Sequence, residues 1–567
     1  MKKMGKRLCI TLLALIMTLA LASSALATPV VTGTKWMVSA SNPLAAQAGA
    51  KILEQGGNAV DAAFATAAAI GVVEPWFSNI LGGGTWGLYY SAKDKSVVAI
   101  EGVGPAPTGA TPEYYADMDI APVGVHWANI PGAFDGWIIT LERYGTMTLA
   151  EVLAPAIELA EEGFPASGDF AFFTRINRDD IIRMPDSARA FLKPDGSTYQ
   201  LGEIVKLTDL ANTYKSLVQA ETENAHKGRS EALFAARDYF YKGEIAEKLV
   251  RFSEENGGFF TMEDFAKTKA QFREPLTVNY RGFDVYACPP NSQGITVLMA
   301  LNILEGFDLK EMGPKNPDSY HAIVESTKLA FADRNHYVGD PEFVDIPIST
   351  LLSKEYAAKQ RQRIDMNGTF EWPIDGGMAN TTTLGVVDAE GNAMSVTTSI
   401  GMNWVVMGDT GIVINNRMTF FNPFEGDPNQ VQPGKKVRHT SNPNMVLKDG
   451  KPYLLIACSG VDTQPQAQIQ GIVGIIDFGY NPFQAAAAPR LVSQAWPMTT
   501  RPHLAANNLG VEAAFDGEIT KALEEKGHKI VHSANFGNMS TVILIDPESG
   551  ALLGGADPRR EATVLGW

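Results

Sequence analysis

The feature of this sequence that most restricts its fold is a pair of strand-like runs that follow an irregular junction. Residues 366–380 hold three glycines and one proline, a composition typical of exposed and irregular backbone. The next two runs, 381–388 and 393–400, are rich in Thr and Val and are separated by a short polar turn. This pattern predicts two paired strands, with Thr381 at the head of the first.

The rest of the chain alternates between helical and strand-like patterns. With 567 residues, 45% of them hydrophobic, it can bury a large core, either as two to four domains or as one large two-sheet enzyme. The expected helices are two Ala-rich segments within 42–69, two segments within 131–163, and 320–335, 464–477 and 519–526. The expected strands are a hairpin within 86–100 and the runs 411–415, 444–447, 453–457 and 541–545.

The first 27 residues have the pattern of a secretory signal peptide. A basic start is followed by an apolar run over 8–21 and by the small-x-small sequence Ala25-Leu26-Ala27. A membrane-spanning helix is the alternative, but the apolar run is short for one. We therefore expect an exported protein, periplasmic or secreted, with residues 1–27 removed.

Charge and cysteine content exclude several classes of function. The net charge of −16 would become −20 without the leader, which disfavours nucleic acid and anionic membranes as partners. Once Cys9 leaves with the leader, Cys288 and Cys458 are too few for a disulfide framework. None of the eight His has an H-E-x-x-H spacing, so we expect neither a metal site nor a cofactor. A G-x-S-x-G nucleophile motif is also absent, so an enzyme of this sequence needs another nucleophile.

Thr381 can supply that nucleophile. A Thr-rich strand taken alone is ordinary half-buried β structure, but here it begins directly after the exposed junction. Cleavage between Asn380 and Thr381 would leave a Thr that carries both a hydroxyl and a free α-amino group. Because the pKa of an α-amino group lies near 8, this group can act as the base for its own hydroxyl.

Several ordered motifs resemble the gamma-glutamyltranspeptidases, which are self-cleaving N-terminal nucleophile hydrolases, over nearly the whole expected mature chain. The first group of motifs is Ile52-Leu53-x-x-Gly56-Gly57-Asn58-Ala59-Val60-Asp61, Asn79-x-x-Gly82-Gly83-Gly84, Tyr144-Gly145-Thr146-Met147, Ala332-Asp333-Arg334 and Ala556-Asp557-Pro558-Arg559. The second group is Thr381-Thr382, Val386-Val387-Asp388-x-x-Gly391-Asn392-Ala393, Gly411-Ile412 and Asn415-Asn416-x-Met418.

The resemblance implies an α+β fold, the four-layer αββα sandwich in which two stacked, mainly antiparallel sheets lie between helical layers. It also implies that Thr381 attacks the Asn380 carbonyl and that an N-to-O acyl shift and ester hydrolysis follow. The products would be a large subunit, 28–380, and a small subunit, 381–567, which together form one fold. The freed Thr would then attack a small-molecule amide, and water or an amine would accept the acyl group.

The resemblance also assigns roles in the active site to individual residues of this sequence. The tandem backbone N–H groups of the oxyanion hole fall on Gly460 and Val461, and Ser399 stands where the family has a supporting Thr hydroxyl. The family's Arg for the substrate α-carboxylate is replaced by Val103, and its Asp for the α-ammonium is replaced by Phe420. Both glutamyl anchors are therefore missing.

Other polar and charged residues stand at or near the positions where the family binds its substrate. The family's paired serines fall on His439 and Thr440, and together with the run 464–466 these resemble a divergent acylase and amidohydrolase branch. We expect Arg417 and His439 beside the pocket, where they can bind a carboxylate on the acyl group, and we expect Lys436 to be solvated.

Three functions remain open at this point. Glutathione hydrolysis or gamma-glutamyl transfer is the family's default activity. Hydrolysis of a non-glutamyl amide, of glutaryl or oxamate type, is what the lost anchors suggest. The third possibility is a non-catalytic exported binding protein that has kept the fold.

Overall fold

The computed structural model describes residues 29–117, 120, 123–369, 381–503, 506–533, 536 and 539–567. The expected leader and Asn380 lie outside these residues, whereas Thr381 lies within them.

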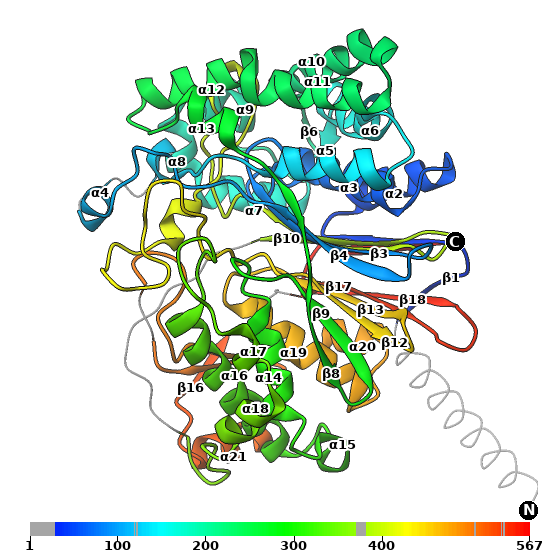
Figure 1. The fold of residues 1–567 in the computed structure, drawn as a ribbon, viewed down its shortest axis with the longest axis vertical. Coiled ribbons are helices and arrows are strands. Elements are labelled where there is room, and N and C mark those ends of the chain that lie inside the picture. The colour runs from blue at the N-terminus through cyan, green and yellow to red at the C-terminus, as the bar shows by residue number, and fades with distance from the viewer. Residues whose placement is uncertain are drawn as a thin grey trace, which may run out of the picture.

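Two seven-stranded sheets are stacked face to face with helices on both outer sides (Figure 1), so the expected α+β sandwich is confirmed. Every strand pair within the two sheets is antiparallel. One sheet, the β10 sheet, has the order β19 (Thr563–Gly566), β2 (Met37–Ala40), β10 (Thr382–Val387), β11 (Ala393–Ser399), β3 (Gly84–Ser91), β4 (Ser96–Gly102), β7 (Gln271–Arg273). The other, the β13 sheet, has the order β1 (Val31–Gly33), β18 (Leu552–Ala556), β17 (Met539–Ile545), β13 (Lys451–Cys458), β12 (Asn444–Lys448), β9 (Phe283–Ala287), β8 (Leu276–Tyr280).

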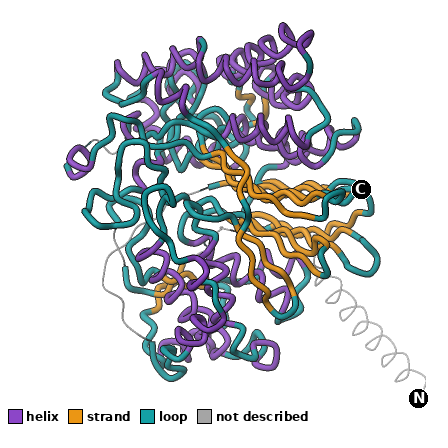
Figure 2. The backbone as a smooth tube through the Cα atoms, viewed as in Figure 1, coloured by secondary structure: helices purple, strands orange, loops and turns teal. Residues whose placement is uncertain are grey.

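Helices cover each sheet from outside, and the tube drawing shows the resulting four layers (Figure 2). The layer on the β10 sheet includes α2 (Pro43–Glu54), α3 (Ala59–Val73), α5 (Ala133–Tyr144), α6 (Leu149–Glu162), α10 (Thr208–Asn224), α11 (Arg229–Lys242) and α12 (Glu244–Glu255). The layer on the β13 sheet includes α14 (Ile295–Leu304), α16 (Pro317–Tyr337), α18 (Lys354–Arg361), α19 (Thr463–Ile476), α20 (Pro482–Ala487) and α21 (Gly517–Glu525). Shorter elements are α4 (Pro112–Ala116), α7 (Gly168–Ile176), α8 (Arg178–Ile182), α9 (Pro185–Phe191), α13 (Met262–Lys267), α15 (Leu309–Met312), α17 (Ile348–Leu351), β5 (Phe164–Pro165), β6 (Ile204–Val205), β14 (Leu491–Ser493), β15 (Leu509–Glu512) and β16 (Ile530–Ser533).

The side-chain alternation of the strands explains the stacking. Along β3, Trp86 and Leu88 point into the core between the two sheets, whereas Tyr89 points into the core beneath the helices. Such a period of two buries both faces of a strand only when each face is covered. Helix α3 is buried at every position, which suits a helix that is apolar on all sides and lies inside the protein.

Most sequence-based expectations for the elements are confirmed, and one is wrong. The helices within 42–69, the hairpin within 86–100 and the strand pair within 381–400 are present. Residues 411–415 form no strand and make only an isolated bridge from Val413 to Val406. The reason is that neighbouring backbone groups in this segment bond to separate loops, since Ile414 N donates to Val405 O and Asn415 N to Gly82 O.

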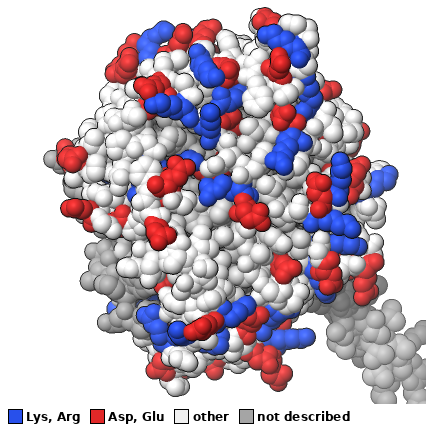
Figure 3. Space-filling model, in the orientation of Figure 1, with Lys and Arg blue, Asp and Glu red and all other residues white. Residues whose placement is uncertain are grey.

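On the face drawn in Figure 3, basic and acidic side chains lie interspersed. Among the described residues, no helix combines the length and the apolar composition needed to cross a membrane.

Candidate active site

Thr381 lies directly before β10 and contacts the end of the neighbouring strand. In the β10–β11 pairing Thr382 stands opposite Thr398, so Ser399 lies beside Thr381. The Ser399 hydroxyl donates to Thr381 Oγ1 at 3.2 Å and accepts from Gly401 N at 3.1 Å. Both side chains are fully buried. The fold therefore brings together the two hydroxyls that the sequence singled out.

The Gly460–Val461 turn connects β13 to α19 and has an unusual backbone. Gly460 has a φ of 103° and Val461 a φ of 50°, a region that a β-branched residue rarely adopts. The side chain of Gln293 holds the turn, because its Nε2 donates to Val461 O at 2.9 Å. A buried ion pair between Arg334 and Asp462 anchors the next residue.

Gln464, in the first turn of α19, bonds to both Thr381 and the Gly460–Val461 turn. The orientation of its amide follows from its neighbours, because its nitrogen faces three oxygen atoms at 2.9–3.0 Å, including Thr440 O and Cys458 O. Its oxygen then accepts from Thr381 Oγ1 at 3.3 Å and from Val461 N at 3.2 Å. Sequence reasoning gave Gln464 no role beside Thr381, and its position in the run 464–466 was the only signal.

Arg417 and His439 are buried and electrostatically coupled. Among the described residues, none of the three guanidinium nitrogens of Arg417 has a hydrogen-bond partner, and neither does His439 Nε2 or Thr440 Oγ1. Burial lowers the pKa of Arg417 to about 9. Burial, and secondarily the charge of Arg417, hold the pKa of His439 well below its usual range, so its imidazole is neutral. The cluster thus presents a cation and two neutral polar groups.

Phe420 and Val103, where the resemblance led us to expect lost charged anchors, lie in the same region as Arg417 and His439. The Arg417 guanidinium lies 4.6 Å from the centroid of the Phe420 ring, a cation–π contact. Gly84 pairs with Ser399 across β3 and β11. A Cβ atom on Gly84 would lie 3.0 Å from His439 Nε2 and 3.6 Å from Val103 Cγ2. Glycine at this position leaves room between these two side chains, next to the Ser399 strand.

The expectation of a solvated Lys436 is wrong. Its ammonium forms an ion pair with the buried carboxylate of Glu101, and only 14% of its side chain is exposed. Glu101 also pairs with Arg273 at 2.7 Å. A buried carboxylate is stable only when it is paired with cations, so the ion pair with Glu101 holds the lysine side chain inside the protein.

A buried carboxyl group supports the strand that follows Thr381. Glu74, at the end of α3, accepts hydrogen bonds from Ser41 Oγ at 2.5 Å and from Thr382 Oγ1 at 3.1 Å. Burial raises the pKa of Glu74 to about 7, although these two bonds and the charge of Arg560 oppose the shift in part. Neither Glu74 nor its contact with Thr382 was anticipated from the sequence.

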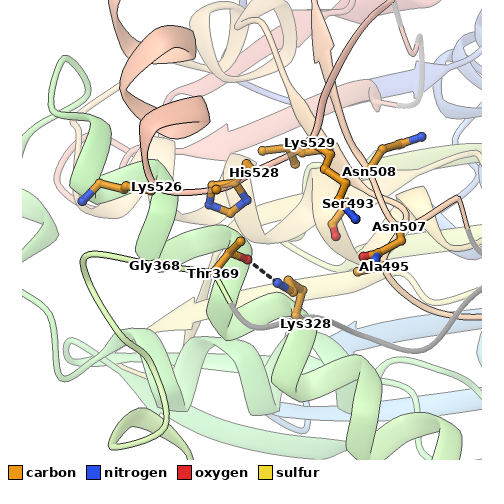
Figure 4. A pocket seen from close by; sticks show the side chains of 12 residues that line it. Lys328, Gly368, Thr369, Ser493, Ala495, Asn507, Asn508, Lys526, His528 and Lys529 are labelled. Carbon is orange, nitrogen blue, oxygen red and sulfur yellow. Dashed lines mark hydrogen bonds between the residues drawn. The ribbon is translucent and has the colours of Figure 1, made fainter.

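One group of His and Glu side chains is close enough together to be considered as a metal site. His321 and Glu325 on α16 meet His528, and all three are buried. His321 Nδ1 and His528 Nε2 are already hydrogen-bonded at 2.8 Å, and Lys328 Nζ donates to Glu325 at 2.9 Å. His528 borders a cavity of about 270 Å³ whose wall includes three lysines, Lys328, Lys526 and Lys529 (Figure 4). This positive surrounding opposes a metal cation.

Comparisons with known proteins match this chain over almost its full length. A sequence model of the family described as Gamma-glutamyltranspeptidase matches residues 45–567. The glutathione hydrolase-like YwrD proenzyme of Bacillus subtilis (strain 168) is 35% identical, with 94% of this chain and 99% of that protein covered. The acylase ACY 1 proenzyme of Pseudomonas sp. (strain SE83) is 34% identical, with 94% of each covered. The crystal structure of the cephalosporin acylase from Bacillus halodurans matches with a TM-score of 0.83 at 33% identity, over 95% of this chain and 97% of that one.

Proposed function

This chain belongs to the gamma-glutamyltranspeptidase family and is a hydrolase, and we propose that Thr381 is its nucleophile, released by cleavage of the Asn380–Thr381 bond. In the maturation step Thr381 Oγ attacks the Asn380 carbonyl carbon, and the peptide C–N bond breaks as an ester forms. Water then hydrolyses the ester. The products are a carboxylate on Asn380 and a free α-amino group on Thr381, in subunits 28–380 and 381–567.

In turnover the α-amino group takes the proton of Thr381 Oγ as this oxygen attacks the substrate amide. The N–H groups of Gly460 and Val461 stabilise the oxyanion that develops. The amine leaves with a proton, and water or a second amine releases the acyl group from the ester. Ser399 donates to Thr381 Oγ1 and thereby orients the nucleophile.

We further propose that the acyl group carries a carboxylate that binds Arg417. The observation that carries this is a fully buried guanidinium without a hydrogen-bond partner among the described residues. Burying a charge costs free energy unless the charge is paired, and a ligand carboxylate would supply the pair. His439 and Thr440 add neutral polar groups. The anchors of a free amino acid are absent, which favours a glutaryl-type over a gamma-glutamyl substrate.

The experiment combines a denaturing gel with an amidase assay. Wild-type protein should give two bands and hydrolyse a glutaryl amide with a kcat/KM at least tenfold above that for the gamma-glutamyl amide of the same amine. Thr381→Ala should remain one chain without turnover. Efficient hydrolysis of the gamma-glutamyl amide would instead identify a glutathione hydrolase, the alternative activity that one relative's name suggests.

We also propose that the protein is exported, because residues 1–27 have the sequence pattern of a signal peptide. Expression in a bacterial host should give a periplasmic or secreted protein whose large subunit begins at Thr28. Terminal sequencing of the large subunit measures this directly, and retention of Met1 would contradict it.

A further inference from the structure

The side chain of Gln464 bonds to both Thr381 and Val461, the two residues to which the proposed function gives the nucleophile and an oxyanion donor. Gln464 Oε1 lies 3.2 Å from Val461 N and 3.3 Å from Thr381 Oγ1, so it accepts from both. These are the two groups between which a substrate carbonyl must lie, because its carbon contacts the nucleophile while its oxygen faces the oxyanion donor. Two oxygen atoms cannot share that position.

The Gln464 side chain is firmly held where it is. It is fully buried, and the two N–H groups of its amide are shared among three acceptors, Thr440 O at 3.0 Å, Asn442 Oδ1 at 2.9 Å and Cys458 O at 3.0 Å. A buried amide with all its groups bonded is costly to move, since each broken bond leaves a desolvated polar atom. Moving the oxygen out of the oxyanion site therefore has a free-energy cost that any bound substrate must offset.

We propose that the Gln464 carboxamide closes the oxyanion site as an internal stand-in for the substrate carbonyl, and that substrate must displace it to react. This inference rests on the proposed roles of Thr381 and Val461. It makes Gln464 a residue that sets the apparent affinity for acyl groups: only a substrate with enough binding energy elsewhere, such as a carboxylate on Arg417, opens the site. Weakly anchored amides then remain unhydrolysed.

The test separates ground-state binding from chemistry in two variants, Gln464→Ala and Gln464→Met. Both remove the carboxamide, and the second keeps the length of the side chain. For each variant we would measure KM and kcat for the glutaryl amide, together with the inhibition constant of 4-boronobutanoic acid. Its boron can bond to Thr381 Oγ and place an oxygen in the oxyanion site. If the site is closed by Gln464, KM and the inhibition constant fall about tenfold and kcat changes less than about threefold.

The control is Gln470→Ala on the same helix, whose amide bonds to Leu491 O and Gln466 O rather than to the nucleophile. This variant should leave the inhibition constant unchanged. A tenfold fall in kcat at unchanged KM would overturn the proposal, because it would make the carboxamide a support of the transition state. An unchanged inhibition constant in both Gln464 variants would overturn it as well.

The Thr381→Ala variant distinguishes a failure of the proposed function from a failure of the Gln464 proposal. If Thr381→Ala still matures and turns over, then Thr381 is not the nucleophile, whatever Gln464 does. If Thr381→Ala loses maturation, turnover and boronate binding, the proposed function stands and the Gln464 result is judged on its own.

Discussion

Among single residues, Arg417 carries a buried charge that lowers the stability of the fold, and in the proposed function this same charge binds the substrate carboxylate. A guanidinium without a hydrogen-bond partner among the described residues destabilises the fold, although Arg417 makes a cation–π contact with the ring of Phe420. By contrast Arg334, equally buried, is paired with Asp462 and bonded to Gln293. The two arginines therefore respond to the same substitution in opposite ways.

We predict that Arg417→Met raises the free energy of unfolding by about 1–3 kcal/mol, because it removes an uncompensated buried charge. The same variant should raise KM for a glutaryl amide at least tenfold and leave an uncharged butyryl amide nearly unaffected. Arg334→Met is the matched control and should destabilise the fold by about 3–5 kcal/mol, because it leaves Asp462 unpaired. Urea unfolding of single-chain Thr381→Ala protein measures the stability effects, and equal destabilisation by both variants would refute the prediction.

The backbone conformation of Val461 predicts how substitutions at this position affect maturation and turnover. Proline removes the N–H but also holds φ near −65°, whereas Val461 has a φ of 50°. Val461→Pro should therefore disrupt the turn and abolish maturation. Val461→Gly keeps the N–H and accepts this φ without strain, so we expect a mature two-chain enzyme with kcat within a few-fold of wild type. Loss of turnover in a folded Val461→Gly variant would mean that the valine side chain, and not only its N–H, is required.

At the scale of elements, Glu74 connects three parts of the β10 layer. It lies at the end of α3, and it bonds to Ser41 after β2 and to Thr382 at the start of β10. The Ser41 and Thr382 hydroxyls also contact each other at 2.5 Å. This group of three side chains positions the first residues of β10 and thereby Thr381, so the protonation state of Glu74 affects how Thr381 is held.

The pKa of Glu74 predicts a pH-dependent stability. Its folded value of about 7 lies above the ordinary value of 4.5, so the folded state keeps the proton between these pH values while the unfolded state loses it. The contribution is complete below about pH 4.5 and is lost as pH rises to about 7, at up to about 1.4 kcal/mol per pH unit. Glu74→Gln should flatten this slope. Urea unfolding of Thr381→Ala protein at pH 5 and pH 7, with and without Glu74→Gln, measures it, and parallel slopes would contradict the assignment.

At the scale of the whole molecule, the two proposed subunits are interleaved in both sheets. In the β10 sheet, β10 and β11 lie between β2 and β3, which precede the proposed cleavage point. In the β13 sheet, β12 pairs with β9 and β18 pairs with β1. Neither subunit can complete a sheet or cover its apolar face alone.

We therefore predict that the cleaved protein stays one particle. Mature enzyme should elute in size-exclusion chromatography at the same position as the single-chain Thr381→Ala protein, while a denaturing gel shows two bands only for the mature form. Separate expression of 28–380 should give aggregated protein, because its strands leave open sheet edges. Elution of the two subunits as separate monomers would contradict this architecture.

Much of this architecture follows from local patterns along the chain. The threonine- and valine-rich runs predicted β10 and β11, the Ala-rich segments predicted α2 and α3, and the ordered motifs indicated the family. These features depend on residues close together in sequence, where propensity and periodicity act. The run 411–415 shows the limit, because its β-type composition was overridden by separate hydrogen bonds to Gly82 and Val405.

Sequence patterns predicted most of the elements and indicated the family, and the resemblance to that family pointed to Ser399 as a partner of Thr381. In the structure the antiparallel pairing of β10 and β11 brings these two hydroxyls together. Contacts between distant parts of the chain decided that Arg417 is buried without a hydrogen-bond partner among the described residues, that the Gln464 side chain lies between Thr381 and Val461, and that Lys436 turns inward. The physical reason is distance along the chain. Lys436 meets Glu101 across 335 residues and Thr382 meets Glu74 across 308, and such pairings exist only once distant segments of the chain have packed together.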